Sequence, residues 1–156
     1  MPATLRNLED KISTMKFSVE IDGVAACGFS EVSGLEMDHD VIEYREGCDS
    51  TTPRKFRGLT KFSDITLKRG ISSDLDLWNL GRRTFDAYTA ATGFSSPIYR
   101  FDLYIIQRDM ANVDQRVWKV TKAWVKKFSM SDLNANQSET AIEEMVLAHE
   151  GFWLEN

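Results

Sequence analysis

The sequence predicts a mainly β protein, a β-barrel or a sandwich of two sheets, with one flanking α-helix. Apolar and polar residues alternate in several short segments, the pattern of strands that bury one face. Residues 72–90 carry apolar side chains at helical spacing and predict one helix. A total of roughly six to eight strands and one helix favours a barrel or sandwich decorated by a helix.

Length and charge limit the classes of protein that fit. The 156 residues suit one domain, residues 1–156, and a domain of this size buries about 68–70% of its unfolded surface without metals or disulfides. The net charge of −5 gives no general attraction to nucleic acid or anionic membranes. Two free thiols, Cys27 and Cys48, are expected, because cytosolic disulfides are rare. Without a signal peptide or an apolar span, we expect synthesis in the cytoplasm and no stable membrane anchoring.

The first third of the chain predicts a loose arm followed by a hairpin. Residues 1–14 are polar and weakly periodic. In Met15–Ile21, the side chains of Phe17, Val19 and Ile21 share the inner face. A turn signal at Asp22-Gly23 leads into Val24–Phe29, which indicates an antiparallel pair.

A stretch between two further strands organises the rest of the chain. Val41–Arg45 and Ile65–Lys68 alternate as strands, whereas Gly47–Lys61 is rich in turn residues and predicts a long loop. Loops of that length usually have a function in compact domains. We therefore expect an extended loop, residues 46–63, that leaves the domain and grips a neighbouring subunit. The predicted interface residues are Arg54, Lys55, Phe56, Arg57, Lys61, Glu43, Tyr44 and Arg45.

The second half predicts a helix and then more strands. Ser72, Ser73 and Asp74 are candidate N-caps of the helix at 72–90, and Gly81 costs about 1 kcal/mol against Ala, enough to split the helix or end its first part. Two strands, Tyr99–Ile105 and Val117–Val125, are expected around a polar turn at 108–115. The run 140–152 fits both a helical and a strand period, and the many other strands favour strand.

No constellation of residues predicts catalysis, a cofactor or a metal. His39 stands between Asp38 and Asp40, but successive side chains of an extended segment point apart, so a solvated loop is the better interpretation. His149-Glu150 lacks the second His of a zinc-protease helix, because that position is Trp153. No nucleophile elbow and no glycine-rich phosphate loop is present, so we expect no enzyme.

A basic and aromatic cluster leaves nucleic-acid binding as an alternative. Trp118 and Trp124 stand among four lysines of the return strand: Lys119, Lys122, Lys126 and Lys127. Lysines on the wet face of a strand more often prevent edge pairing, and a nucleic-acid surface favours arginine and a basic protein. The solvated face is therefore the preferred interpretation.

Several short motifs, in order, resemble the inner-tube proteins of contractile-tailed phages and of related bacterial contractile injection systems. The resemblance covers the chain from about Phe17 to Leu154. The motifs are Phe29–Glu36 (FSEVSGLE), Ile42–Gly47 (IEYREG), Thr52–Lys55 (TPRK), Gly58–Lys61 (GLTK), Ile65–Gly70 (ITLKRG), Trp78, Ala123-Trp124, Asp132–Ala135 (DLNA) and Leu147–Phe152 (LAHEGF).

The resemblance implies a tail-tube-like subunit that forms hexameric rings. Such rings stack on a baseplate inside a sheath, so it implies self-association, sheath and baseplate partners, and a lumen for cargo or DNA without sequence-specific binding. Synthesis would be in a bacterial cytoplasm, and assembly in a phage tail or injection particle. Two departures from the family are the long connection Gly81–Pro97 and Val125, where the family often has Pro.

Two rival functions remain open from the sequence. One is a tube-initiating or adaptor ring on the baseplate of the same machine. The other is a small soluble enzyme or ligand-binding barrel, which predicts a stable monomer with a defined pocket.

Overall fold

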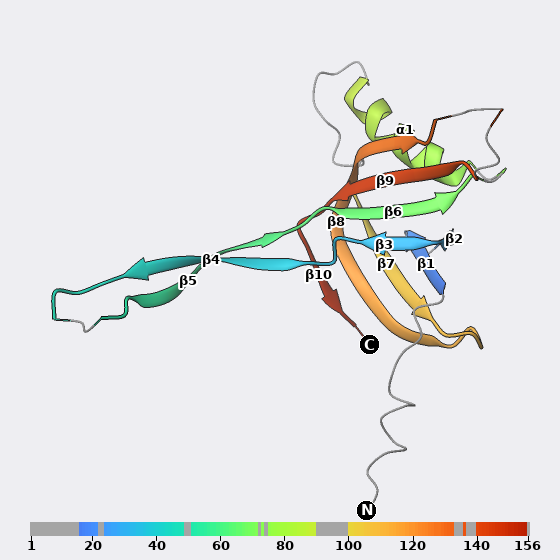
Figure 1. Cartoon of the computed structure of the whole chain (residues 1–156). Coiled ribbons are helices and arrows are strands. Elements are labelled where there is room, and N and C mark those ends of the chain that lie inside the picture. The colour runs from blue at the N-terminus through green and yellow to red at the C-terminus, as the bar shows by residue number, and fades with distance from the viewer. Residues whose placement is uncertain are drawn as a thin grey trace, which may run out of the picture.

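Ten strands and one helix make up the described part of the chain (Figure 1). The computed structural model describes residues 16–21, 24–48, 51–71, 73, 75–89, 100–132, 136 and 140–155, without the side chains of 24–27, 83 and 85–89. The elements are β1 (Lys16–Ile21), β2 (Val24–Phe29), β3 (Glu31–Ser33), β4 (Met37–Tyr44), β5 (Arg54–Phe62), β6 (Ile65–Gly70), α1 (Asp76–Thr89), β7 (Phe101–Arg108), β8 (Asp114–Met130), β9 (Ile142–Ala148) and β10 (Gly151–Leu154).

Eight strands form one curved antiparallel sheet, and β4 and β5 form a separate two-stranded ribbon. The sheet runs in the order β2-β1-β7-β8-β9-β6-β3, and β10 adds to the first half of β8. The two predicted hairpins are present as β1–β2 and β7–β8. The turn predicted at Asp22-Gly23 lies outside the described residues, and so does the N-terminal segment 1–14 that was predicted to be loose. The prediction of a mainly β fold of two sheets with one helix is confirmed.

Strand β8 bends the sheet around the core. Up to Ala123 it pairs with β7, and over part of that length also with β10; from Trp124 onward it pairs with β9. Lys122 has a φ of 49°, and its backbone N–H donates to Asp102 Oδ1 at 3.0 Å, where the β7–β8 register shifts. A bulge of this kind kinks a strand, because the extra residue increases its local twist. One strand can therefore serve both halves of the sheet.

A group of ion pairs lies at this bend. Glu150, in the turn between β9 and β10, forms ion pairs with Arg100 at 2.5 Å and with Lys122 at 3.3 Å. Its backbone N–H also donates to the carbonyl of Thr121 at 3.2 Å. The hydrogen bond from Lys122, helped by the charges of Lys122 and Arg100, lowers the pKa of Glu150 below 4.5. The carboxylate of Glu150 therefore stays charged at neutral pH and links the β9–β10 turn to Lys122 of β8 and to Arg100, the residue before β7.

The core lies between the curved sheet and the helix. Among the side chains predicted to face inward, Val19, Ile65 and Leu67 are buried, and Phe17 and Ile21 are partly buried against them. The helix contributes Leu77 and Leu80, and Trp78 packs edge-on against Phe128 of β8 with the ring centroids 5.7 Å apart. The largest fully buried side chains are Ile65, Leu67, Leu103, Ile105, Met145, Leu147, Val19 and Val120.

The expected long loop is the main error of the sequence analysis. Residues 54–62 of the segment interpreted as a loop form β5, and only residues 45–53 connect it to β4. Apolar and polar residues alternate along a strand when one face of that strand packs on a hydrophobic core and the other faces solvent. The β4–β5 ribbon has no such core beneath it, so β5 lacks the pattern even though its backbone pairs along β4. Strand β4 also begins at Met37, four residues before the predicted start at Val41.

Other boundaries differ because backbone pairing extends strands past their apolar residues. β8 spans 114–130 rather than 117–125, which reduces the polar turn to residues 109–113. The run 140–152 is strand, as preferred, but it is divided into β9 and β10 at His149-Glu150. Strand β3 was not predicted, and together with β5 and the division of the last strand it brings the described strands to ten rather than six to eight.

The helix is continuous through Gly81, contrary to the expected interruption. It spans 76–89, while two of its candidate caps, Ser72 and Asp74, lie outside the described residues. A Cβ at Gly81 would lie 3.8 Å from Phe128, which is an ordinary contact. The cost of one glycine, about 1 kcal/mol, is smaller than the benefit of burying the apolar face of the helix on β8.

In the described chain no helix has the length and apolar character to cross a membrane. Cys48 is an exposed free thiol.

We predict that Gly34→Ala destabilises the fold and that Gly47→Ala does not. Gly34 has a φ of 89°, and a Cβ there would lie 2.0 Å from the Asp64 carbonyl oxygen. Strain and overlap together should cost roughly 2 kcal/mol or more of the free energy of unfolding. Nothing lies within 4 Å of a Cβ at Gly47, which makes that variant the control. Equal unfolding midpoints of both variants in urea would contradict this account.

Candidate functional site: a projecting arm

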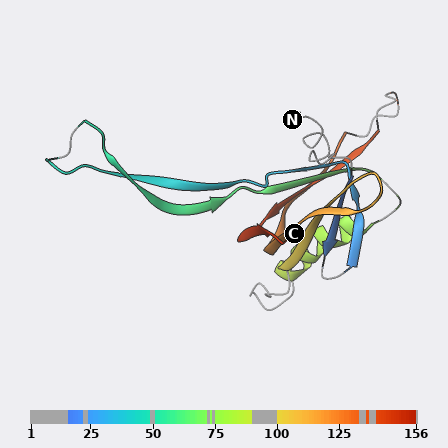
Figure 2. The same cartoon turned by 90° about the horizontal axis from the view of Figure 1, so that it is seen from below.

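The most distinctive feature of the molecule is the β4–β5 ribbon, which we call the arm (residues 37–62). It extends away from the eight-stranded sheet in both views (Figures 1 and 2). Its two strands pair with each other and with no other strand of the described part of the chain. The arm occupies the segment predicted to leave the domain, but as a paired ribbon rather than a loop. Its role in gripping a neighbour remains a prediction.

The register of the two strands gives the arm two different faces. Residues paired across antiparallel strands lie on the same face. Ile42 pairs with Phe56 and Tyr44 with Arg54 on one face, which we call the apolar face. The paired positions of the opposite, charged face are Val41 with Arg57 and Glu43 with Lys55.

The apolar face is open to solvent. Ile42, Tyr44 and Phe56 are each more than half exposed, and the Tyr44 and Phe56 rings lie 6.5 Å apart in a tilted contact. A two-stranded ribbon has no second layer to cover such side chains, and isolated ribbons are only marginally stable in water. An exposed apolar surface of this kind is typical of a binding surface.

All eight predicted interface residues lie on the arm. Arg54, Lys55, Phe56, Arg57 and Lys61 are on β5, Glu43 and Tyr44 are on β4, and Arg45 follows β4 directly. The prediction did not include the apolar side chains Val41, Ile42 and Leu59, although Leu59 is 74% exposed. The Val41-Ile42 pair in the predicted strand was the available signal.

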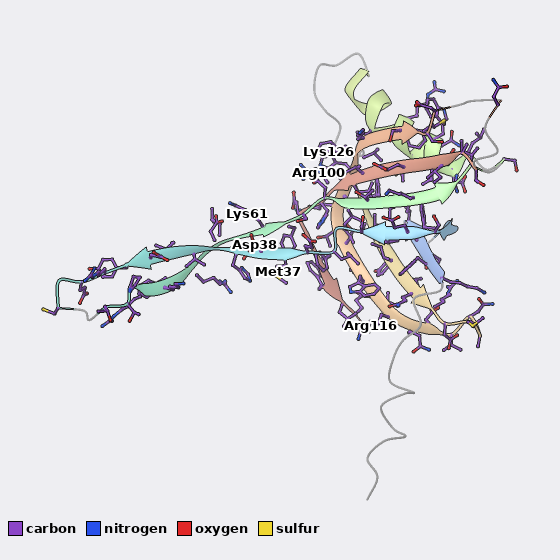
Figure 3. The ribbon with its side chains drawn as sticks, viewed as in Figure 1. Met37, Asp38, Lys61, Arg100, Arg116 and Lys126 are labelled. Atoms are coloured by element: carbon purple, nitrogen blue, oxygen red, sulfur yellow. The ribbon has the colours of Figure 1, made fainter. Side chains whose placement is uncertain are left out.

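Polar contacts stiffen the half of the arm nearest the sheet. Lys61 Nζ lies 2.9 Å from Asp40, and that hydrogen bond with the carboxylate charge raises the pKa of Lys61 above 10.5. His39 Nδ1 lies 2.9 Å from Thr60 Oγ1. Figure 3 shows Asp38 and Lys61 on the arm close to its junction with the sheet. His39 therefore has a partner within the arm, and the described residues contain no group of side chains suited to a metal ion.

An aromatic cluster anchors the root of the arm. Phe62, the last residue of β5, packs edge-on against Phe152 at 5.6 Å and against the His149 ring at 5.8 Å. His149 Nε2 donates to the Ser63 carbonyl at 2.9 Å, and the Ser63 backbone N–H donates to the Glu36 carbonyl at 3.3 Å. His149 thus contributes to holding the root of the arm in place.

A salt bridge continues this root onto β8. Lys126 Nζ lies 2.6 Å from Asp64 Oδ2, at the bulge in the β8–β9 register. Figure 3 shows Lys126 near the start of the arm. The β5 end of the arm is therefore tied to the sheet through side chains of β8, of β10 and of the β9–β10 turn.

The lysines of the basic and aromatic cluster are largely engaged within the chain. Lys119 lies over the Tyr104 ring at 5.7 Å, Lys122 pairs with Glu150, and Lys126 pairs with Asp64. These contacts favour the solvated-face interpretation over a nucleic-acid surface.

Comparison with known proteins gives a family match over most of the chain. The model of the family described as T4-like virus tail tube protein gp19 matches residues 13–153. No curated protein sequence is similar enough to add to this comparison.

Several solved structures share the fold. A chain of the PVC sheath–tube complex, an extracellular contractile injection system in its extended state, has a TM-score of 0.74 at 22% identity, with 95% of this chain and 93% of that chain covered. A chain of the anti-feeding prophage baseplate has a TM-score of 0.69 at 16% identity, covering 92% and 94%. Hcp1 from Flavobacterium johnsoniae has a TM-score of 0.52 at 15% identity, covering 90% and 94%. At these identities the likenesses establish the fold.

We predict that Phe62→Ala loosens the root of the arm, whereas Phe56→Ala leaves the isolated fold intact. Phe62 is partly buried in the aromatic cluster, so its truncation should cost about 2 kcal/mol, below the 3–5 kcal/mol of a fully buried Phe. Phe56 is half exposed, and such surface changes usually stay within about 0.5 kcal/mol. Urea unfolding measures both costs, and hydrogen exchange of the β5 amides reports the arm. A Phe62→Ala variant as stable and as protected as the wild type would refute the anchoring role.

Proposed function

We propose that the chain is a structural subunit of the inner tube of a contractile injection system or phage tail. The basis is its family, because the chain belongs to the T4-like virus tail tube protein gp19 family. Hexameric rings of the chain stack into the rigid conduit that sheath contraction drives through a target envelope. The observation that carries this proposal, beside the family, is the arm. It presents an apolar face that its own chain leaves open to solvent.

The arm supplies the link between copies. Its apolar side chains Ile42, Tyr44 and Phe56 are withdrawn from water when they lie against a neighbouring subunit. Many identical contacts act together in a tube, so modest pairwise affinities combine into strong cohesion. The anchored root transmits load from the arm to the sheet, since Phe62 and Asp64 are tied to the β9–β10 turn and to β8.

The proposed partners outside the tube are a sheath protein and a baseplate. The similar chains come from a sheath–tube complex and from a baseplate, which supports both as partners of this chain. The net charge of −5 would also let DNA or acidic cargo pass through the lumen without sticking, since like charges repel. A lumen lined mainly by Lys and Arg would contradict the last point.

A tube-initiating ring on the baseplate is the second candidate. The likeness to a chain of the anti-feeding prophage baseplate favours it. Particle imaging separates the two candidates, because an initiator occurs once in each particle and a tube subunit fills its length. The rival of another class, a small enzyme or ligand-binding barrel, gains no support from a family of structural tube proteins.

We predict that reversing three arm charges weakens assembly and spares the fold. In Arg54→Glu/Lys55→Glu/Arg57→Glu, acidic residues replace basic ones on both faces of the arm, while the core stays untouched. The concentration needed for assembly should rise about tenfold, which corresponds to about 1.4 kcal/mol. Electron microscopy measures tube length, and circular dichroism checks the fold.

A charge-conserving variant, Arg54→Lys/Lys55→Arg/Arg57→Lys, is the matched control and should assemble like the wild type. Tubes of wild-type length from the reversed variant would count against the role of the arm.

A further inference from the structure

A second exposed apolar cluster lies at the end of the sheet away from the arm. We call it the end patch; its members come from the end of β6, the start of α1, the end of β8 and the start of β9. Their exposed fractions run from 40% to 63%. They are Ile71, Leu75, Trp78, Met130 and Ile142.

Backbone contacts bring these segments together. Gly70 pairs with Ile142, and the N–H of the following Ile71 donates to the Ala141 carbonyl at 2.9 Å. The Ser131 N–H donates to the Ile142 carbonyl at 2.9 Å, which places the end of β8 beside the start of β9. Trp78 reaches β8 through its contact with Phe128. Segments distant in sequence thus share one surface.

The end patch and the root of the arm are at opposite ends of β6. That strand begins at Ile65, three residues after the arm, and ends at Gly70, which puts the two about 17 Å apart at 3.3 Å per residue. In both views the arm points away from the end of the sheet where β6 stops and α1 begins (Figures 1 and 2). An arm on one end and a patch on the other cannot meet within one molecule, but they can meet between copies placed head to tail.

The two surfaces are complementary in charge as well as in polarity. On the apolar face of the arm, the basic residue Arg54 pairs with Tyr44. Acidic residues accompany the end patch, since Asp76 begins α1 directly after Leu75, and the exposed Asp132 follows Met130 by two residues. Opposite potentials on two surfaces favour their encounter and fix their orientation.

We propose that the end patch of one copy receives the apolar face of the arm of an adjacent copy. This inference rests on the proposed function and names the surface that the arm engages. Arm and patch are different surfaces, so the contact is heterologous and can continue from copy to copy in a ring or a stack. It covers Ile42, Tyr44 and Phe56 of one copy and apolar side chains such as Leu75 of the next.

A photo-reactive residue on each face of the arm tests this directly. Tyr44→p-benzoylphenylalanine places the probe on the apolar face, and Glu43→p-benzoylphenylalanine places it one residue away on the charged face. Both are introduced into the full chain in assembled particles, which are irradiated, digested with trypsin and analysed by mass spectrometry. The Tyr44 probe should mark the peptide 70–82, which holds three patch residues, and the peptide 128–156 near its patch residues Met130 and Ile142. The Glu43 probe should mark these segments weakly.

A substitution in the patch provides the second measurement. Leu75→Glu adds a carboxylate at an exposed position beside the helix N-terminus, where negative charge is favourable, so the fold should survive. It should lower the yield of the Tyr44 cross-link about tenfold, because a charge would have to lose its water at the contact. Met110→Glu changes another exposed side chain in the β7–β8 turn and should alter the yield less than about twofold.

Three outcomes would overturn the inference. If particles assemble but the Tyr44 probe marks another part of the chain or a sheath protein, the end patch is not the receiving surface, and the proposed function stands. An unchanged yield of the Tyr44 cross-link in Leu75→Glu would likewise show that the end patch is not the receiving surface and would leave the proposed function standing. If the wild-type chain enters no assembly and gives no intermolecular cross-link, the proposed function fails together with this inference.

Discussion

A two-stranded ribbon cannot bury its own apolar face, and this constraint governs the rest of the molecule. In the arm, Ile42, Tyr44 and Phe56 lie on one face with no second layer over them. The sheet and helix fold around their own core and leave the arm outside it. The unfavourable exposure of these side chains ends only when another surface covers them. A chain built in this way is suited to association with its own copies.

The sheet is constructed to support such an arm. Strand β8 carries the bend, with Lys122 in a left-handed conformation held by Asp102, and Glu150 bridges the two segments at that point. The same β9–β10 turn that contains Glu150 also supplies His149 to the root of the arm. A load on the arm is therefore passed to the centre of the sheet rather than to a loose connection. This arrangement fits a subunit of a rigid tube of the tail tube family.

Sequence patterns predicted those parts of the fold that pack on the common core. The alternation around Val19 and around Ile65 identified β1 and β6, because buried residues fall on every second position. The same reasoning failed for β5, since both faces of the arm reach solvent and no alternation is required. The predicted interface set was centred on the basic residues of this segment and included Tyr44 and Phe56 of the apolar face, but it did not include Ile42. The end patch was also missed, because its five members become neighbours only after β6, α1, β8 and β9 have come together.

The central claim is that the arm is covered by another copy of the chain. Electron cryo-microscopy of the native particle tests it most directly, at a resolution that shows side chains. The account predicts rings of this chain in which each arm lies against an adjacent copy and Ile42, Tyr44 and Phe56 are removed from solvent. Arms that project freely into solvent in a complete tube, or a protein that occurs only as a monomer, would contradict it.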